Sequence, residues 1–72
     1  MKLEFTNHAK HRLFIERGIS VDEIKKVIRE PDNIILLPDG VEKCEKEIGR
    51  DTLVVVYRKE KNVYIIITAY FK

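Results

Sequence analysis

Two consecutive runs of β-branched and aromatic residues decide the fold: TLVVVYRK at residues 52–59 and NVYIIITAYF at residues 62–71. Val, Ile, Thr, Tyr and Phe are enriched in strands, and the short polar connection between the runs predicts a hairpin. Upstream, residues 33–37 and 41–48 predict another pair of strands, because the turn signal Pro38-Asp39-Gly40 separates them. Sequential strands with short connections favour an antiparallel meander.

The first third of the chain predicts two helices. Thr6 is a favoured N-cap for a helical pattern that runs from Asn7 to Arg17, and Gly18 fits the residue that ends it. Ser20-Val21-Asp22-Glu23 is a capping box that begins a second helix, which Pro31 stops.

These elements predict an α+β fold formed by one domain over residues 1–72. We expect two N-terminal helices packed on one face of a four-stranded antiparallel sheet, in the order α-α-β-β-β-β. Residues 2–5 are expected to be a short extended piece that leads into the first helix.

Strand periodicity divides the last two strands between two faces of the sheet. Two helices can cover only one face, so we expect the second face to be open. The apolar set, expected under the helices, comprises Leu53, Val55, Tyr57, Val63, Ile65, Ile67, Ala69 and Phe71. The set expected on the open face comprises Val54, Val56, Arg58, Tyr64, Ile66, Thr68 and Tyr70.

Composition excludes several protein classes. The chain has 72 residues, of which 44% are hydrophobic and 36% charged, as expected for a folded domain rather than a disordered one. The net charge of +2 is not the strongly basic balance of a typical nucleic-acid binder, although it does not forbid RNA as a partner. A single cysteine, no apolar run near the ~20 residues of a membrane span and no secretory signal pattern together favour a cytoplasmic protein with no membrane partner.

His8 and Arg12 form the first candidate site because they lie four residues apart, which is one turn of a helix. A histidine that titrates near neutral pH suits proton transfer, and a guanidinium binds phosphate in a bidentate manner. The alternative is that His8 packs at the helix start while Arg12 pairs with Glu16 or Glu4. Arg17 adds a third cation, or is an ordinary cation at a helix C-terminus.

The expected open face offers a second candidate, an anion or RNA site, because tyrosine rings stack on bases and arginine binds phosphate. A partly apolar open face fits a protein contact equally well, for example with a second copy of the chain. The residues concerned are Arg58, Tyr64, Thr68 and Tyr70, with added charge from Lys46 and Arg50.

Other titratable residues carry less information. Glu45 and Glu47 alternate with Lys46 and suggest an edge strand protected by charge. Cys44 belongs to no motif and is expected to pack in the core. No zinc-ligand spacing, phosphate-binding loop or dinucleotide fingerprint occurs, so no cofactor or metal is expected.

The stretch Phe5-Thr6-Asn7-His8-Ala9-Lys10-His11-Arg12 resembles the opening of a family of small prokaryotic domains of unknown function that begin Phe-Thr-x-His-Ala-x-x-Arg. The resemblance continues through Pro31-Asp32, Gly49-Arg50, residues 54–57 and residues 66–70, and so spans almost the whole chain. That family is similar to the RelE-like toxins and their barnase, EndoU and colicin relatives, which are metal-independent ribonucleases.

The resemblance implies an α-α-β-β-β-β fold and a role as an endoribonuclease or toxin-like RNA-binding domain of a toxin–antitoxin system. The alternative is a non-catalytic interaction domain that forms a homodimer, or binds an antitoxin-like protein, through the open sheet face. Under the first hypothesis the catalytic candidates are His8, Arg12, Arg58 and Tyr70, and the substrate-binding candidates are Arg17, Lys46, Arg50, Tyr64 and Thr68.

Overall fold

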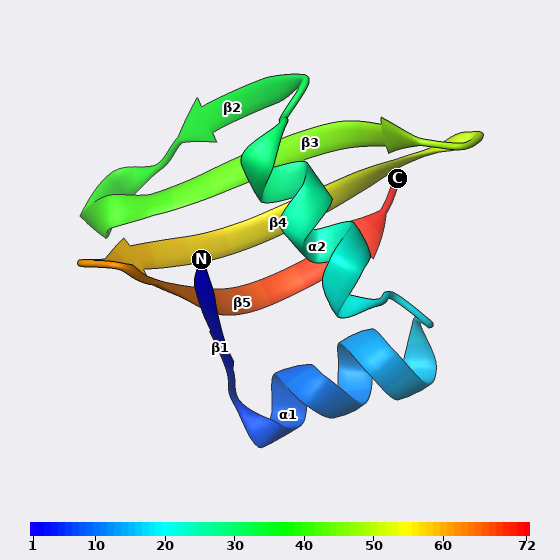
Figure 1. Cartoon of the computed structure of the whole chain (residues 1–72), viewed down its shortest axis with the longest axis horizontal. Helices are drawn as coiled ribbons and strands as arrows, with labels where there is room; N and C mark the ends of the chain where they lie inside the picture. Colours follow the sequence, from blue (N-terminus) through cyan, green and yellow to red (C-terminus); the bar gives the residue numbers. More distant parts are fainter.

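A five-stranded mixed sheet organises the computed structural model, which describes all residues from Met1 to Lys72 (Figure 1). The strands lie in the order β1-β5-β4-β3-β2, and the helices cover one face. The elements are β1 (Lys2–Phe5), α1 (Asn7–Lys10), the π-helix η1 (His11–Glu16), α2 (Val21–Arg29), β2 (Asn33–Leu36), the short 3-10 turn η2 (Pro38–Gly40), β3 (Val41–Ile48), β4 (Asp51–Glu60) and β5 (Val63–Phe71).

The prediction of four antiparallel strands is wrong, although the α+β class is confirmed. β1 is a fifth strand and runs parallel to β5, with Lys2 paired to Val63 and Phe5 paired to Ile66. Only Leu3 and Phe5 of this strand pack against the core, so its apolar pattern is too short to stand out in the sequence. The order is therefore β-α-α-β-β-β-β.

The second helix begins and ends as the sequence predicts. Ser20 Oγ accepts a hydrogen bond from the Glu23 N–H at 3.1 Å, and Glu23 Oε1 accepts one from the Ser20 N–H at 2.9 Å, which completes the capping box. α2 lies over β3 and β4 (Figure 1), and the residues that it buries are Ile24, Val27 and Ile28.

The first helix is not uniformly α-helical. After α1 the chain forms a π-helix, in which backbone hydrogen bonds span five residues, as between the Arg17 N–H and the Arg12 O at 3.0 Å. Ala9 and Leu13 are buried, and the predicted Gly18 end follows with a φ of 63°, a left-handed conformation that favours glycine. The π-helix accommodates one more residue than an α-helix would over the same length.

A second single-residue insertion lies in β5. Val56 pairs with Thr68 and Tyr57 pairs with Ile66, so Ile67 is an extra residue that forms a β-bulge. The bulge inverts the alternation of side chains along the strand. Before the bulge, Tyr64 and Ile66 face the core, while Val63 and Ile65 lie on the other face.

The predicted division of the sheet faces is therefore wrong for the first half of β5 and right for the second half. Ala69 is fully buried with Leu53 and Val55, as expected. The remaining core comprises Leu13, Ile19, Ile24, Val27, Ile28, Cys44, Tyr57 and Ile66, all on the helix side of the sheet.

Candidate functional site

The side-chain hydrogen bonds with the largest sequence separation join the end of the first helix to the last strand. The Arg17 guanidinium donates from one nitrogen to the Ala69 carbonyl at 2.8 Å and to Thr68 Oγ1 at 3.2 Å, across a separation of 51 residues for Thr68. β1 ends opposite Ile66, so β5 has no neighbouring strand beyond that point. Arg17 therefore supplies a donor at the part of the β5 edge that β1 leaves unpaired.

The π-helix aligns Arg17 with the two residues of the opening motif. His8 and Arg12 are four residues apart, the spacing of an α-helical turn, and Arg12 and Arg17 are five apart, the spacing of the π-helical hydrogen bonds. In a continuous α-helix Glu16 would follow Arg12 on this face. We name the three basic side chains His8, Arg12 and Arg17, together with the Thr68 hydroxyl that Arg17 contacts, the cationic row.

Glu16 instead belongs to the neighbouring side of the helix. Its carboxylate lies 3.5 Å from His11 Nε2, a contact that again joins residues five apart. His8 and Arg12 are exposed and form no hydrogen bond or ion pair within the chain through their side chains. The prediction that Arg12 pairs with Glu16 or Glu4 is therefore not met, and the guanidinium is available to an external anion.

The open-face residues meet the cationic row at Thr68. Tyr70 lies two residues further along β5 on the same face, and Arg58 lies beyond Val56, the partner of Thr68. Arg58 and Tyr70 thus flank Thr68 on the face away from the helices. His8 and Arg12 belong to the helical layer, so only the Arg17–Thr68 contact joins the two groups.

Three other predicted site residues lie apart from this point. Tyr64 faces the core, where its ring packs edge-on to Tyr57 with centroids 5.2 Å apart. Arg50 is exposed in the turn between β3 and β4. Lys46 is mostly buried and forms an ion pair with Asp32 at 3.5 Å.

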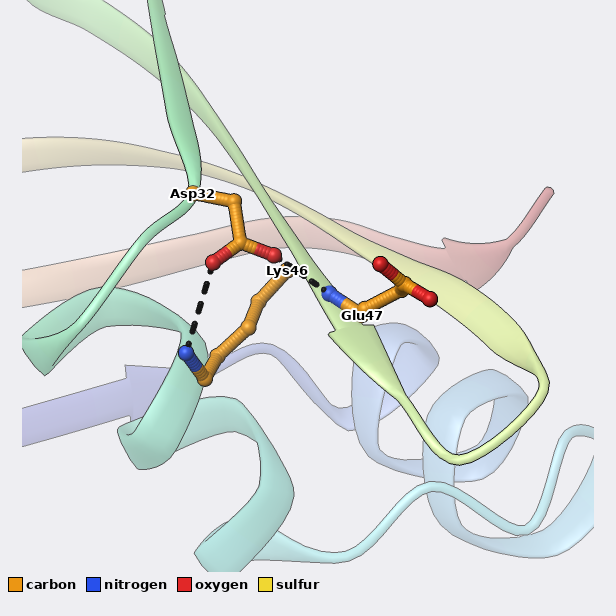
Figure 2. A network of polar contacts seen from close by, with 3 residues as sticks. All are labelled: Asp32, Lys46 and Glu47. Atoms are coloured by element: carbon orange, nitrogen blue, oxygen red, sulfur yellow. Dashed lines mark hydrogen bonds and ion pairs between the residues drawn. The ribbon is translucent and has the colours of Figure 1, made fainter.

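Figure 2 shows that Asp32 holds two partners at the start of β2. The Glu47 N–H donates to one carboxylate oxygen at 2.9 Å while Lys46 approaches the other. These contacts lower the pKa of Asp32, chiefly through the backbone hydrogen bond. The network joins the segment between α2 and β2 to β3. Because β2 pairs with β3, β3 is an inner strand and not the charged edge that Glu45 and Glu47 suggested.

A polar cluster that the sequence does not reveal lies in the core. The Tyr57 hydroxyl donates to Glu42 Oε1 at 2.6 Å and lies 3.4 Å from Cys44 Sγ. Burial raises the pKa of both the Tyr57 hydroxyl and the Cys44 thiol. Cys44 is 1% exposed, so its predicted packing role is confirmed, and this cluster has no access to a large substrate.

The surface hollows of the molecule do not coincide with the cationic row. One, of about 560 Å³, is lined by residues of β1, β5 and the β4–β5 turn, and the other, of about 520 Å³, lies near Met1 and Tyr64. No three His, Cys, Asp or Glu side chains gather as metal ligands would. Neither helical segment has the length and apolarity needed to span a membrane.

One known protein family covers almost the whole described fold. The family model described as "Domain of unknown function (DUF4258)" matches residues 5–71, which is almost the whole chain. The chain belongs to this family. No curated protein and no solved structure is significantly similar to the chain. The DUF4258 match begins at Phe5, the first residue of the opening stretch that contains His8 and Arg12.

Proposed function

We propose that this DUF4258 domain binds single-stranded RNA and cleaves it without a metal ion, as a toxin-like endoribonuclease. The observation that carries the proposal is the Arg17–Thr68 contact, which unites two candidate substrate-binding residues from opposite ends of the chain. Arg12 lies one π-helical turn from Arg17, so two guanidinium groups are placed to share one phosphate-rich ligand.

The positions of the two backbone irregularities support this site. The π-helix ends at Glu16, directly before Arg17, and the bulge residue Ile67 directly precedes Thr68. Both kinds of irregularity are over-represented at functional sites, because a single inserted residue redirects the side chains that follow it. Here the two irregularities directly precede the two residues that touch.

The chemistry needed for metal-free RNA cleavage fits the residue types of the row. A base removes the proton of the 2′-hydroxyl, the 2′-oxygen attacks phosphorus, and the 5′-oxygen leaves with a proton, which yields a 2′,3′-cyclic phosphate. His8 accepts the proton of the 2′-hydroxyl and donates it to the leaving 5′-oxygen. Arg12 and Arg17 stabilise the extra negative charge on the phosphoryl oxygens. Thr68 and Tyr70 position the strand, and Arg58 contacts a neighbouring phosphate.

An exposed row also suits a polymeric substrate. Small molecules require a concave pocket, whereas single strands bind along surfaces that combine cations with aromatic rings. Tyr70 is half-buried on the sheet face next to Thr68, and we assign its ring to stacking on a base beside a phosphate held by Arg17.

The test is cleavage of a fluorescently labelled single-stranded RNA and of tRNA by the purified protein in the presence of a chelator. We expect cleavage with cyclic-phosphate ends, and a loss of about 100-fold or more in rate for His8→Ala, because general acid–base groups contribute about 10²–10⁴-fold. His11→Ala is the matched control, since His11 is exposed on the same helix but pairs with Glu16 outside the row.

Binding measured separately distinguishes the roles. Arg17→Met and Thr68→Val should each weaken RNA binding, and a wild-type protein that binds RNA without cleaving it would remove the enzymatic part of the proposal. Equal rates for the wild type, His8→Ala and Arg17→Met would refute the site. Docking of a protein partner on the open face has less support, because Val54 at its centre is already fully buried within the chain.

A further inference from the structure

Two surface hollows of similar size flank the turn between β4 and β5. The turn projects beyond the helices at one end of the sheet (Figure 1). The hollow of about 520 Å³ is lined by Met1, Lys59, Asn62 and Tyr64, and we name it the tyrosine hollow. Its volume lies in the range of about 300–1,000 Å³ that is typical of sites for small organic ligands.

The β4–β5 hairpin places a cation and an aromatic ring side by side in the tyrosine hollow. Lys59 pairs with Tyr64 across the hairpin, so both side chains leave the sheet on the same face. Lys59 Nζ lies 5.3 Å from the centroid of the Tyr64 ring, which is a cation–π contact. The ring also packs edge-on to Tyr57, whose hydroxyl is held by Glu42. The aromatic wall of the hollow is therefore supported from within the chain.

The polar groups of the tyrosine hollow have no partners within the chain. The Lys59 ammonium forms no ion pair, and the Asn62 amide and the Tyr64 hydroxyl form no hydrogen bond. No buried side-chain polar atom lacks a partner, so the unpartnered Tyr64 hydroxyl reaches the surface. Cation, amide and hydroxyl are all available to a ligand.

The second hollow has a similar volume but the opposite charge. It measures about 560 Å³ and is lined by Glu4, Glu60, Lys61, Val63 and Ile65. Two carboxylates beside one ammonium disfavour an anion there. No acidic residue lines the tyrosine hollow, because Glu60, the acid that follows Lys59 in the sequence, belongs to the second hollow. Of the two hollows, only the tyrosine hollow suits an anion.

We propose that the tyrosine hollow binds one nucleotide, with its base on the Tyr64 ring and its phosphate on the Lys59 ammonium. Stacking on tyrosine accepts any base, and lysine binds phosphate as a point charge. The Asn62 amide offers both a donor and an acceptor, the combination that matches the edge of adenine. The nucleotide is either free or one unit of a single-stranded RNA, and the second source rests on the proposed function.

The first experiment follows the backbone amide signals of the isotope-labelled protein by NMR while adenosine monophosphate (AMP), adenosine or inorganic phosphate is added. We expect saturable shifts at Lys59, Asn62 and Tyr64 with AMP. Adenosine and phosphate should each bind about tenfold more weakly or worse, because each lacks one of the two main contacts. Absence of saturable shifts at these residues, or equal affinities for AMP and phosphate, would overturn the proposal.

Variants of the turn test the assigned contacts. Lys59→Gln should weaken AMP binding about tenfold, because it removes the charged partner of the phosphate. Lys61→Gln is the matched control, since Lys61 is an exposed lysine of the same turn that lines the second hollow. Both lysines are exposed, so both variants should fold. An equal loss in the two variants, or no loss in Lys59→Gln, would contradict the site.

The role of Asn62 has its own test. Asn62→Ala should remove a preference for AMP over uridine monophosphate, because the variant lacks the amide that pairs with the base edge. A wild type that binds both nucleotides equally would contradict this role.

A second experiment distinguishes the two sources of the nucleotide by measuring the binding of oligoadenylates of increasing length. An affinity that rises with length, and falls for the long oligonucleotides in Lys59→Gln, identifies RNA as the source. An affinity equal to that of AMP at every length identifies a free nucleotide. AMP binding by a protein that neither binds nor cleaves RNA would refute the proposed function and retain the hollow, whereas RNA cleavage without AMP binding would refute the hollow alone.

Discussion

Replacing Tyr57 by phenylalanine removes a single hydroxyl from the core and keeps the ring. The hydroxyl donates a 2.6 Å hydrogen bond to Glu42 Oε1, and the ring is 3% exposed. A hydrogen bond to a charged group contributes about 1.5–3 kcal/mol, and its loss leaves a half-buried carboxylate without its donor. For a domain of this size, the melting temperature should then fall by roughly 10 °C.

The same substitution changes how stability depends on pH. Burial raises the pKa of Tyr57, so the folded state keeps the phenolic proton at a pH where the unfolded state has lost it. The free energy of unfolding should therefore decrease as pH rises above about 10, the ordinary pKa of tyrosine. Cys44 adds to the decrease, because the pKa of its thiol is raised as well. In Tyr57→Phe only the Cys44 contribution remains, and the alkaline decrease should be smaller.

Urea denaturation at pH 7 and at several alkaline pH values measures both effects. Tyr64→Phe is the control at pH 7, since the Tyr64 ring packs against Tyr57 but its hydroxyl makes no hydrogen bond within the chain. The reasoning fails if Tyr57→Phe is no more destabilising than Tyr64→Phe at pH 7, or if its alkaline decrease equals that of the wild type.

Two further predictions concern the helices. Deletion of Ile15, which is 73% exposed, should convert the π-helix to a regular α-helix, because Arg12 and Arg17 would then be four residues apart, and Arg17 should stay against Thr68. Thermal denaturation should show a change in the free energy of unfolding within about 1 kcal/mol; a loss of several kcal/mol would contradict the interpretation of the π-helix as a single-residue insertion. Ser20→Ala removes the capping oxygen of α2 and should destabilise the protein by about 1 kcal/mol in the same assay, whereas an unchanged stability would show that the capping box has no energetic role.

Local patterns in the sequence predicted most of the secondary structure. The β3 bounds and the capping box of α2 are where the sequence places them, because strand periodicity, turn residues and caps act over a few neighbouring positions. The burial of Ala9, Leu13 and Cys44 also follows from these patterns. The α+β class needed nothing beyond this information.

The errors arise where a single residue changes the phase of a pattern or where pairing is non-local. β1 is too short to be recognised in the sequence. It pairs with a parallel strand that is distant in the sequence, since Lys2 lies opposite Val63, about 60 residues later. The bulge at Ile67 sends Tyr64 to the core, although uninterrupted alternation from Ala69 back through β5 places it on the other face. A period of two cannot anticipate such a shift, because a one-residue slip moves every preceding side chain to the opposite face.

The same phase changes account for what the sequence did and did not show of the candidate site. The opening motif singled out His8 and Arg12 as candidates, whereas regular α-helical spacing would bring Glu16 rather than Arg17 after them. Only the π-helix brings Arg17 into the row, and the bulge lets Ile66 be buried while Thr68 stays on the opposite face. A regular helix and strand could bury the same Leu13, Ile66 and Ala69 without either insertion. Core packing alone therefore gives no reason for both insertions to meet at one contact, whereas the proposed RNA site, which needs two guanidinium groups beside a hydroxyl, offers one.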